Sequence, residues 1–226
     1  MSRNPYPREK MNKKLERQCQ EHNIPLEYIQ VQRDTDEQTQ IKRPEDLMLR
    51  MLRADGFQGT ARELHPVMML LQAGCADHLE KGAKKIICED YRARSFHVQI
   101  GMYCLDQKII VNAIKGKSRA ELLSAWEYIY SNDQIQQWFP GIERDDIAAV
   151  FDGLGMERLL QIAEMIFDNP EDHANGWPDI FAYDGRKMIL IEVKTKDALR
   201  ESQIYTWKNL LPQIGLEAKV VCLERV

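Results

Sequence analysis

Three charged residues near the C-terminus have the types and spacing of a cation-binding site. Glu192 and Lys194 follow Met188-Ile189-Leu190-Ile191, an apolar run without alternation that predicts a strand covered on both faces. Because these two residues are two positions apart, their side chains leave the same face of that strand. The third residue, Asp179, precedes a shorter predicted strand at 180–183.

A predicted β-hairpin determines where Asp179 lies relative to this strand. Asp184-Gly185 is typical of a two-residue turn, which here would join strands at 180–183 and 187–194. Such a turn places Asp179 on the same face as Glu192 and diagonal to it, with roughly 7–8 Å between the two backbones. We therefore expect the two carboxylates to converge.

Two converging carboxylates can hold one small, hard cation, because ions such as Mg²⁺ prefer carboxylate oxygens and keep several waters. Lys194 beside them can position or deprotonate one of these waters and stabilise negative charge on a phosphate. The alternative is structural: Glu192 and Lys194 form an ion pair at the strand end, and Asp179 caps the turn after Pro178. Burying two acids together is costly without a cation, which favours the cation site.

Gln203 stands where a hydrophobic residue is expected. The predicted helix at about 198–211 carries an apolar stripe of Leu199, Trp207 and Leu210, and Gln203 lies on that stripe. Two interpretations are open. The amide is buried and hydrogen-bonded to the backbone, or it is directed at a metal-bound water or a substrate phosphate.

This cluster and its surroundings resemble the VRR-NUC domain of the PD-(D/E)XK nuclease superfamily. The similarity rests on Gly176-Trp177-Pro178-Asp179, on Glu192-Val193-Lys194, and on Lys196, Asp197, Leu199, Gln203 and Trp207. A narrower branch, the Fanconi-anaemia-associated nucleases and their bacterial or stand-alone relatives, is similar further upstream. That similarity rests on Gly56-Phe57-Gln58-Gly59-Thr60-x-x-Glu63 before an apolar helix, and on the stretch Ile147–Phe181.

The resemblance implies a restriction-endonuclease-like PD-(D/E)XK core. This is an α/β fold with a mixed central sheet flanked by helices, here with a large helical and hairpin insertion at about 80–145. The polar residues 1–43 are expected to form an N-terminal arm with one helix over Arg8–Gln20, and residues 44–226 the nuclease domain.

The resemblance also implies a role for each residue of the site. Glu63, Asp179 and Glu192 would bind Mg²⁺ or Mn²⁺ together with the carbonyl group of Val193, and Lys194 would be the catalytic lysine. Gln203 is counted with the catalytic residues, because the same family places a polar group there.

Glu63 has an alternative interpretation. Thr60-Ala61-Arg62-Glu63 has the form of a capping box, which usually marks only the start of a helix. Pro66 argues against this interpretation, because a helix that began at Thr60 would carry a proline in its interior. The family usually has a small residue after this acid, and Leu64 departs from that pattern.

Elsewhere, periodicity and caps predict a largely helical chain. Helices are expected at 44–54, 66–82, 118–130 and 145–168 (the last broken at Gly155), a hairpin at 95–114, and a final strand at 219–223. Asp197 is interpreted as the N-cap of the helix at Ala198. A basic stretch is interpreted as solvated surface, with phosphate tracking as the alternative; it contains Lys81, Lys84, Lys85, Tyr91, Arg92 and Arg94.

Composition limits the classes of function. The chain has 226 residues and a formal charge of −4, which excludes a protein that coats nucleic acid by bulk charge but not an enzyme that contacts it locally. Five widely spaced cysteines without a CxxC pair argue against a disulfide framework or zinc site and favour an intracellular location. No segment approaches the roughly 20 apolar residues of a membrane span, and the N-terminus lacks the apolar core of a signal peptide.

Together these observations predict a Mg²⁺- or Mn²⁺-dependent deoxyribonuclease, selective for flaps, ends or branches and single-stranded ends. Because Glu63 and Asp179 are far apart in sequence, the resemblance to the Fanconi-associated branch implies an insertion over the dimer face, which favours a monomer. An accessory protein is a further expected partner that would help to hold the DNA. DNA repair, phage defence and element mobility are all compatible settings. The alternative is a non-catalytic nuclease-like module that binds DNA or a partner protein.

Overall fold

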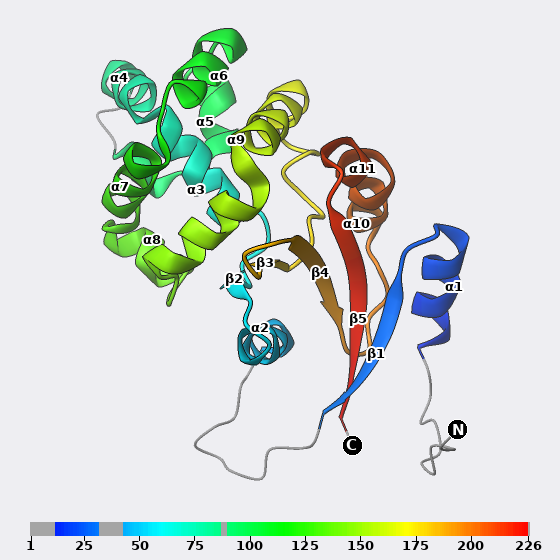
Figure 1. Cartoon of the computed structure of the whole chain (residues 1–226). Coiled ribbons are helices and arrows are strands. Elements are labelled where there is room, and N and C mark those ends of the chain that lie inside the picture. The colour runs from blue at the N-terminus through cyan, green and yellow to red at the C-terminus, as the bar shows by residue number, and fades with distance from the viewer. Residues whose placement is uncertain (1–11, 32–42, 87–89, 226) are drawn as a thin grey trace.

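A mixed sheet carries the predicted site in the computed structural model, which describes residues 12–31, 43–86 and 90–225 (Figure 1). The strands are β1 (Leu26–Val31), β2 (Gln58–Thr60), β3 (Ile180–Tyr183), β4 (Met188–Lys194) and β5 (Glu217–Arg225). Within the described residues they form one sheet in the order β1-β5-β4-β3-β2. β5 pairs in parallel with β1 and β4, and β3 pairs antiparallel with β4 and β2.

Helices cover both faces of this sheet, which confirms the predicted α/β fold class with a mixed central sheet. On one face, α2 (Pro44–Ala54) buries Met48 and Leu52 in a cluster that includes Ile191 and Val193. Along β4, Ile191 and Val193 alternate with residues whose side chains leave the other face of the sheet. Val193 therefore points to α2, and Glu192 points away from it.

The second face packs against the C-terminal helical segment. This segment consists of α10 (Glu201–Tyr205), the π-helical turn η3 (Thr206–Leu210) and α11 (Leu211–Ile214). Trp207 belongs to the same buried cluster as Leu190 of β4. The face that carries Glu192 is thus closed by the helix that carries Gln203.

A lobe of helices connects β2 to β3 and lies to one side of the sheet (Figure 1). Its elements are α3 (His65–Gly74), α4 (Ala76–Ile86), the 3₁₀ turn η2 (Tyr91–Ala93), α5 (Phe96–Met102), α6 (Gln107–Lys115), α7 (Arg119–Tyr130), α8 (Asp133–Trp138) and α9 (Arg144–Asp168). α3 is buried from Pro66 to Gly74 and contacts α7 and α9. The helix expected at 66–82 is interrupted at Cys75, whereas the break expected at Gly155 is confirmed by its φ of 71° within α9.

The hairpin predicted at 95–114 is wrong, because this segment forms α5 and α6. Phe96, Gln99 and Ile100 are buried at helical spacing, while Val98 is 42% exposed. The apolar alternation that suggested a strand therefore arises by chance, and the residues that are actually buried follow a helical spacing. Asp106 is a helix cap rather than a turn residue, since its carboxylate accepts a hydrogen bond from the N–H of Ile109 at 3.0 Å.

The two-residue turn predicted at Asp184-Gly185 is also wrong. The Asp184 carboxylate accepts hydrogen bonds from the N–H groups of Arg186 (2.8 Å) and Lys187 (2.9 Å), so four residues connect the strands. Tyr183 consequently pairs with Met188, which moves the register by two residues. A shift of two preserves which face each side chain occupies.

The predicted N-terminal arm contributes an edge strand to the sheet, which no pattern in the sequence indicated. β1 runs parallel to β5, and α1 (Lys13–Glu21) buries Leu15 and Cys19 against the main core. Residues 8–11 of the helix expected over Arg8–Gln20 lie outside the described residues. The domain boundary at residue 44 stays a prediction.

Among the helices that the structure describes, none combines the length and apolar character needed to cross a membrane.

The close approach of β2 to β3 gives a test of the sheet edge. Gly59 has φ of 152°, and a Cβ there would lie 2.0 Å from the carbonyl oxygen of Phe181. We expect Gly59→Ala to lower the free energy of unfolding by about 2–4 kcal/mol, because the two strands would have to separate. Gly101→Ala in α5 is the matched control, since nothing lies within 4 Å of its added Cβ. Urea denaturation of both variants decides; equal stabilities would contradict this packing.

Candidate catalytic site

The corrected register places Asp179 directly opposite Glu192. Ile180 pairs with Ile191, so the next step outward brings the two acids together on one face of the sheet. Asp179 Oδ2 accepts a hydrogen bond from the N–H of Val193 at 2.8 Å. This bond holds the Asp179 carboxylate at the end of β4, and the pair is closer than the diagonal arrangement that the sequence suggested.

Glu192 is buried beside two other predicted site residues. Its side chain is 1% exposed, and its Oε1 lies 2.7 Å from the Nζ of Lys194. The same Oε1 accepts a hydrogen bond from the Nε2 of Gln203. Lys194 Nζ also donates to Gln203 Oε1 at 3.2 Å, so the three side chains form a closed triangle.

The first interpretation of Gln203 is confirmed, whereas its direction toward a metal-bound water or a substrate phosphate stays a prediction. Gln203 is a buried amide whose Oε1 accepts from the backbone N–H of Arg200 at 2.9 Å, and it contacts Glu192 and Lys194 as well. Its position depends on a close approach between two segments. Gly176, at φ 78°, lies so near α10 that an added Cβ would be 2.3 Å from the carbonyl oxygen of Ser202.

The second oxygen of Glu192 tests whether the site suits a cation. Among the described residues, Oε2 of Glu192 is buried without a hydrogen-bond partner. A buried carboxylate oxygen without a donor is unfavourable, and a cation bound there would satisfy it. The two acids therefore fit a hard divalent ion, although in the described part of the chain no group of three His, Cys, Asp or Glu side chains is arranged to hold a metal ion.

Glu63 reaches the site from the sheet edge. Its backbone N–H donates to the carbonyl oxygen of Asp179 at 2.9 Å, and its charge raises the pKa values of Asp179 and Glu192. Glu63 has φ of 49°, a left-handed conformation that non-glycine residues adopt at a cost and that is enriched at functional sites. The capping-box alternative is wrong, because Thr60 lies in β2 and α3 begins only at His65.

Glu45 is a further acid near the site that no sequence pattern indicated. Its charge raises the pKa of Asp179, and its Oε2 lies 3.4 Å from the Nε of Arg43. Glu45 follows Pro44 in the first turn of α2, where acidic residues are favoured by the helix dipole alone. The helix dipole is a sufficient local explanation for an acid at this position. The proximity of Glu45 to Asp179 arises only when α2 packs on the sheet.

Burial controls the protonation of the two central acids. Loss of hydration raises the pKa of Glu192 to about 8, the nearby charge of Asp179 adds to the increase, and Lys194 opposes it. Burial also raises the pKa of Asp179 to about 6, against the hydrogen bond from Val193. In the metal-free chain, Glu192 therefore holds a proton that an exposed glutamate would have released.

The segment around Lys196 and Asp197 is arranged differently from the prediction. α10 begins at Glu201, with Arg200 as its N-cap residue, so Asp197 does not cap a helix at Ala198. The side-chain amide of Asn12 instead donates to the carbonyl oxygens of Lys196 (2.8 Å) and Asp197 (3.0 Å). A long-range contact from the N-terminal region thus holds the strand-to-helix connection, which no local signal indicates.

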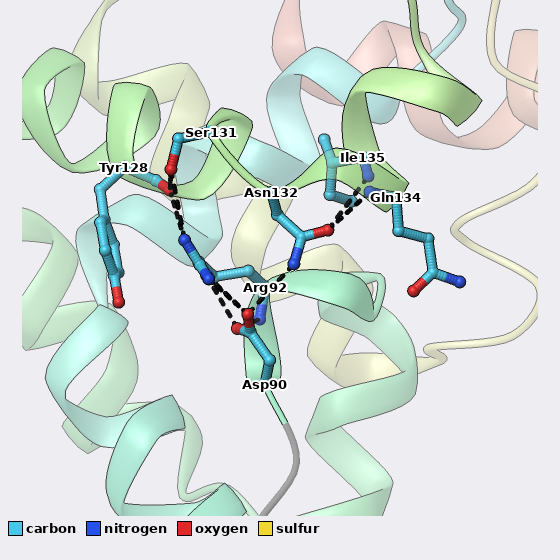
Figure 2. Close-up of polar contacts among 7 residues, drawn as sticks. All are labelled: Asp90, Arg92, Tyr128, Ser131, Asn132, Gln134 and Ile135. Atoms are coloured by element: carbon cyan, nitrogen blue, oxygen red, sulfur yellow. Dashed lines mark hydrogen bonds and ion pairs between the residues drawn. The ribbon is translucent and has the colours of Figure 1, made fainter.

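The basic stretch is largely committed to partners within the lobe. Arg92 makes paired hydrogen bonds to Asp90 and lies over the ring of Tyr128, 4.6 Å from its centroid (Figure 2). Lys84 pairs with Glu80 at 2.7 Å, and Tyr91 is buried. Lys84 and Arg92 are thus paired within the lobe, while the choice between solvated surface and phosphate tracking for the stretch stays a prediction.

Comparison with known proteins bears on the fold. The chain matches no protein-family model and no curated protein. Two similar solved structures are paFAN1 bound to 2-nucleotide 5′-flap DNA with a gap (13% identity, TM-score 0.67) and paFAN1 bound to 1-nucleotide 5′-flap DNA with a gap (12% identity, TM-score 0.63). In both, the similarity covers 90% of this chain and 38% of that chain. The chain thus has the fold of part of paFAN1, consistent with a PD-(D/E)XK-like core.

Proposed function

We propose that this protein is a metal-dependent deoxyribonuclease that hydrolyses phosphodiester bonds in flap, branched or end-containing DNA. The observation that carries this proposal is the buried carboxylate of Glu192, which faces Asp179 and Lys194 and has one oxygen without a donor among the described residues. The structural similarity to paFAN1 bound to 5′-flap DNA supports the choice of substrate.

Asp179, Glu192 and Glu63 would hold the metal ion, with the carbonyl group of Val193 as a further oxygen ligand. Mg²⁺ and Mn²⁺ suit these oxygen donors. When bound, such an ion supplies Lewis-acid activation of water and of the phosphate oxygens. Ionised acids are required for this binding, so the raised pKa values of Asp179 and Glu192 make protons direct competitors of the metal.

Lys194 would stabilise the charge that develops on the phosphate. Its side chain is 11% exposed, so it acts in a partly dehydrated environment where a positive charge is more effective. Glu192 and Gln203 accept hydrogen bonds from Nζ and thereby fix its direction. Gln203 is a positioning residue in this scheme, because it acts through Lys194 and Glu192.

Removal of Lys194 tests whether the site is catalytic. We expect Lys194→Ala to slow cleavage of flap, junction and single-stranded DNA by about a hundredfold to ten-thousandfold with Mg²⁺ or Mn²⁺. Lys208→Ala, an exposed lysine of η3, is the control and should cleave like the wild type. Equal rates for Lys194→Ala and wild type, or no cleavage by either across these substrates, would favour the non-catalytic nuclease-like module.

The buried acids predict an inverse dependence of stability on pH. The native state keeps protons that the unfolded chain releases near pH 4, so without divalent cations the free energy of unfolding should fall between about pH 5 and pH 8. The loss should be on the order of a few kcal/mol. Glu192→Gln should weaken this dependence of the free energy of unfolding on pH. Mg²⁺ or Mn²⁺ should restore stability at pH 8 in the wild type only.

Denaturant titrations in chelator at several pH values measure this dependence. Glu217→Gln, on the neighbouring strand, is the control, because Glu217 is 75% exposed and should leave the slope unchanged. A stability that rises from pH 5 to pH 8 in chelator would refute the buried-acid account.

Glu45 is expected to tune the pH at which the enzyme becomes active. Because its charge raises the pKa of Asp179, Glu45→Gln should move the acidic limb of kcat/KM to lower pH by less than about one unit. Asp77→Asn, in the corresponding first turn of α4, should not move it. Activity lost equally at every pH would show instead that Glu45 acts as more than a neighbouring charge.

A further inference from the structure

A second polar site is lined by residues adjacent in sequence to Glu45 and Glu63, and it has no role in the scheme above. It is a crevice of about 270 Å³ between α2, β2 and the beginning of α9. Its polar lining consists of Asp46, Arg50, Arg53, Thr60, Arg62 and Asp146. Three arginines in one crevice suit an anion, provided that their charges are not already balanced.

Only two of these arginines are balanced by acids. Arg53 lies 2.7 Å from Asp146, which is 8% exposed, and Arg62 lies 2.7 Å from Asp46. Arg50 is exposed on α2 and has no ion-pair or hydrogen-bond partner among the described residues. The crevice therefore carries a net positive charge, located on Arg50.

Two buried polar groups in the crevice lack partners within the described chain. Thr60 is 3% exposed, and its hydroxyl group makes no hydrogen bond. The Nε–H group of Arg62 is likewise buried without an acceptor. Leaving such groups unsatisfied costs about 1–3 kcal/mol each, and native proteins usually avoid it. The hydroxyl group of Thr60 and the guanidinium groups of Arg50 and Arg62 can all donate hydrogen bonds, which matches an acceptor-rich anion such as a phosphate.

The crevice and the acids are built by the same two segments. Asp46 directly follows Glu45 in α2, and Arg62 directly precedes Glu63 after β2. In each pair one side chain lines the crevice and the other acts on the buried acids. A nucleic-acid strand whose phosphodiester lies at the acids would therefore carry its next phosphates past this crevice.

We propose that this crevice binds a backbone phosphate of the DNA strand being cut, close to the scissile bond. Arg50 supplies the free positive charge, and Thr60 and the Nε–H of Arg62 donate hydrogen bonds to the phosphate oxygens. The crevice fixes the register of the strand relative to the acids. This inference rests on the proposed nuclease function, since the phosphate belongs to its substrate.

Salt-dependent DNA binding tests the contact without cleavage. Measured in full-length Lys194→Ala protein with 5′-flap DNA, the slope of log affinity against log salt should fall in magnitude by about 1 when Arg50→Ala is added. Thr60→Val, which removes the hydroxyl at nearly constant volume, should weaken binding severalfold with the slope unchanged. Arg17→Ala on α1, another exposed helical arginine, is the matched control and should change neither.

Neutral methylphosphonate linkages identify the phosphate. At one position near the cleavage site, the substitution should weaken binding to Lys194→Ala protein but have little further effect when Arg50→Ala is present, a coupling that a double-mutant cycle measures. An unchanged slope in Arg50→Ala, or additive effects at every position, would overturn the crevice assignment.

The two failures are distinguishable. If wild type cleaves the flap and Lys194→Ala does not, while Arg50→Ala binds with an unchanged slope, the proposed function stands and the crevice assignment falls. If wild type binds the flap without cleaving it, the proposed function falls, and the coupled position still supports the phosphate contact.

Discussion

The buried carboxylate of Glu192 is the group on which the rest of the structure depends. An ionised carboxylate at 1% exposure is strongly unfavourable unless charges and donors replace its lost hydration. Lys194 supplies a charge and Gln203 supplies a donor, both to the same oxygen. Among the described residues the other oxygen has no donor, and the charge of Asp179 opposite further opposes ionisation of Glu192. A globular fold has no reason to build such a pair for stability alone, which is why the site points to chemistry.

The surrounding elements can be understood as supports for that group. Gly176 allows the segment before Asp179 to approach α10, and the indole N–H of Trp177 anchors the same segment to the carbonyl oxygen of His173 at 2.7 Å. β2 brings Glu63 to the site through a backbone bond to Asp179. The helical lobe fixes β2 in turn, because α3 follows it directly and is buried along its length. Segments that are far apart in the sequence thus position the groups around the Glu192 carboxylate through backbone contacts.

The charge of the chain is consistent with local rather than general binding of nucleic acid. With a formal charge of −4, the protein cannot hold DNA by bulk attraction. Several of its cations form internal ion pairs: Arg92 pairs with Asp90 (Figure 2), and Arg53 pairs with Asp146. If the proposed nuclease function holds, specific contacts near the acids carry the recognition of DNA, rather than the overall charge of the protein.

Some features followed from the sequence alone because they depend on local periodicity. Side chains in a strand alternate faces, so Glu192 and Lys194 had to share one, and Asp179 stayed on that face even though the turn was misjudged by two residues. The helical stripe likewise placed Gln203 among buried residues. Gly155 marked the break in α9 for the same local reason.

Only the tertiary structure decided what depends on contacts between distant segments. Hydrogen bonds to the Asp184 carboxylate stabilise the four-residue turn, and this turn sets the register in which Asp179 lies directly opposite Glu192. The segment that begins at Phe96 has an alternating apolar pattern, but it folds as a helix because its apolar side chains are buried in the lobe. The packing of α2 on the sheet places Glu45 near Asp179. Sequence patterns report which face of an element is apolar. They do not report which other element meets that face, because that choice is made by the packing of the whole core.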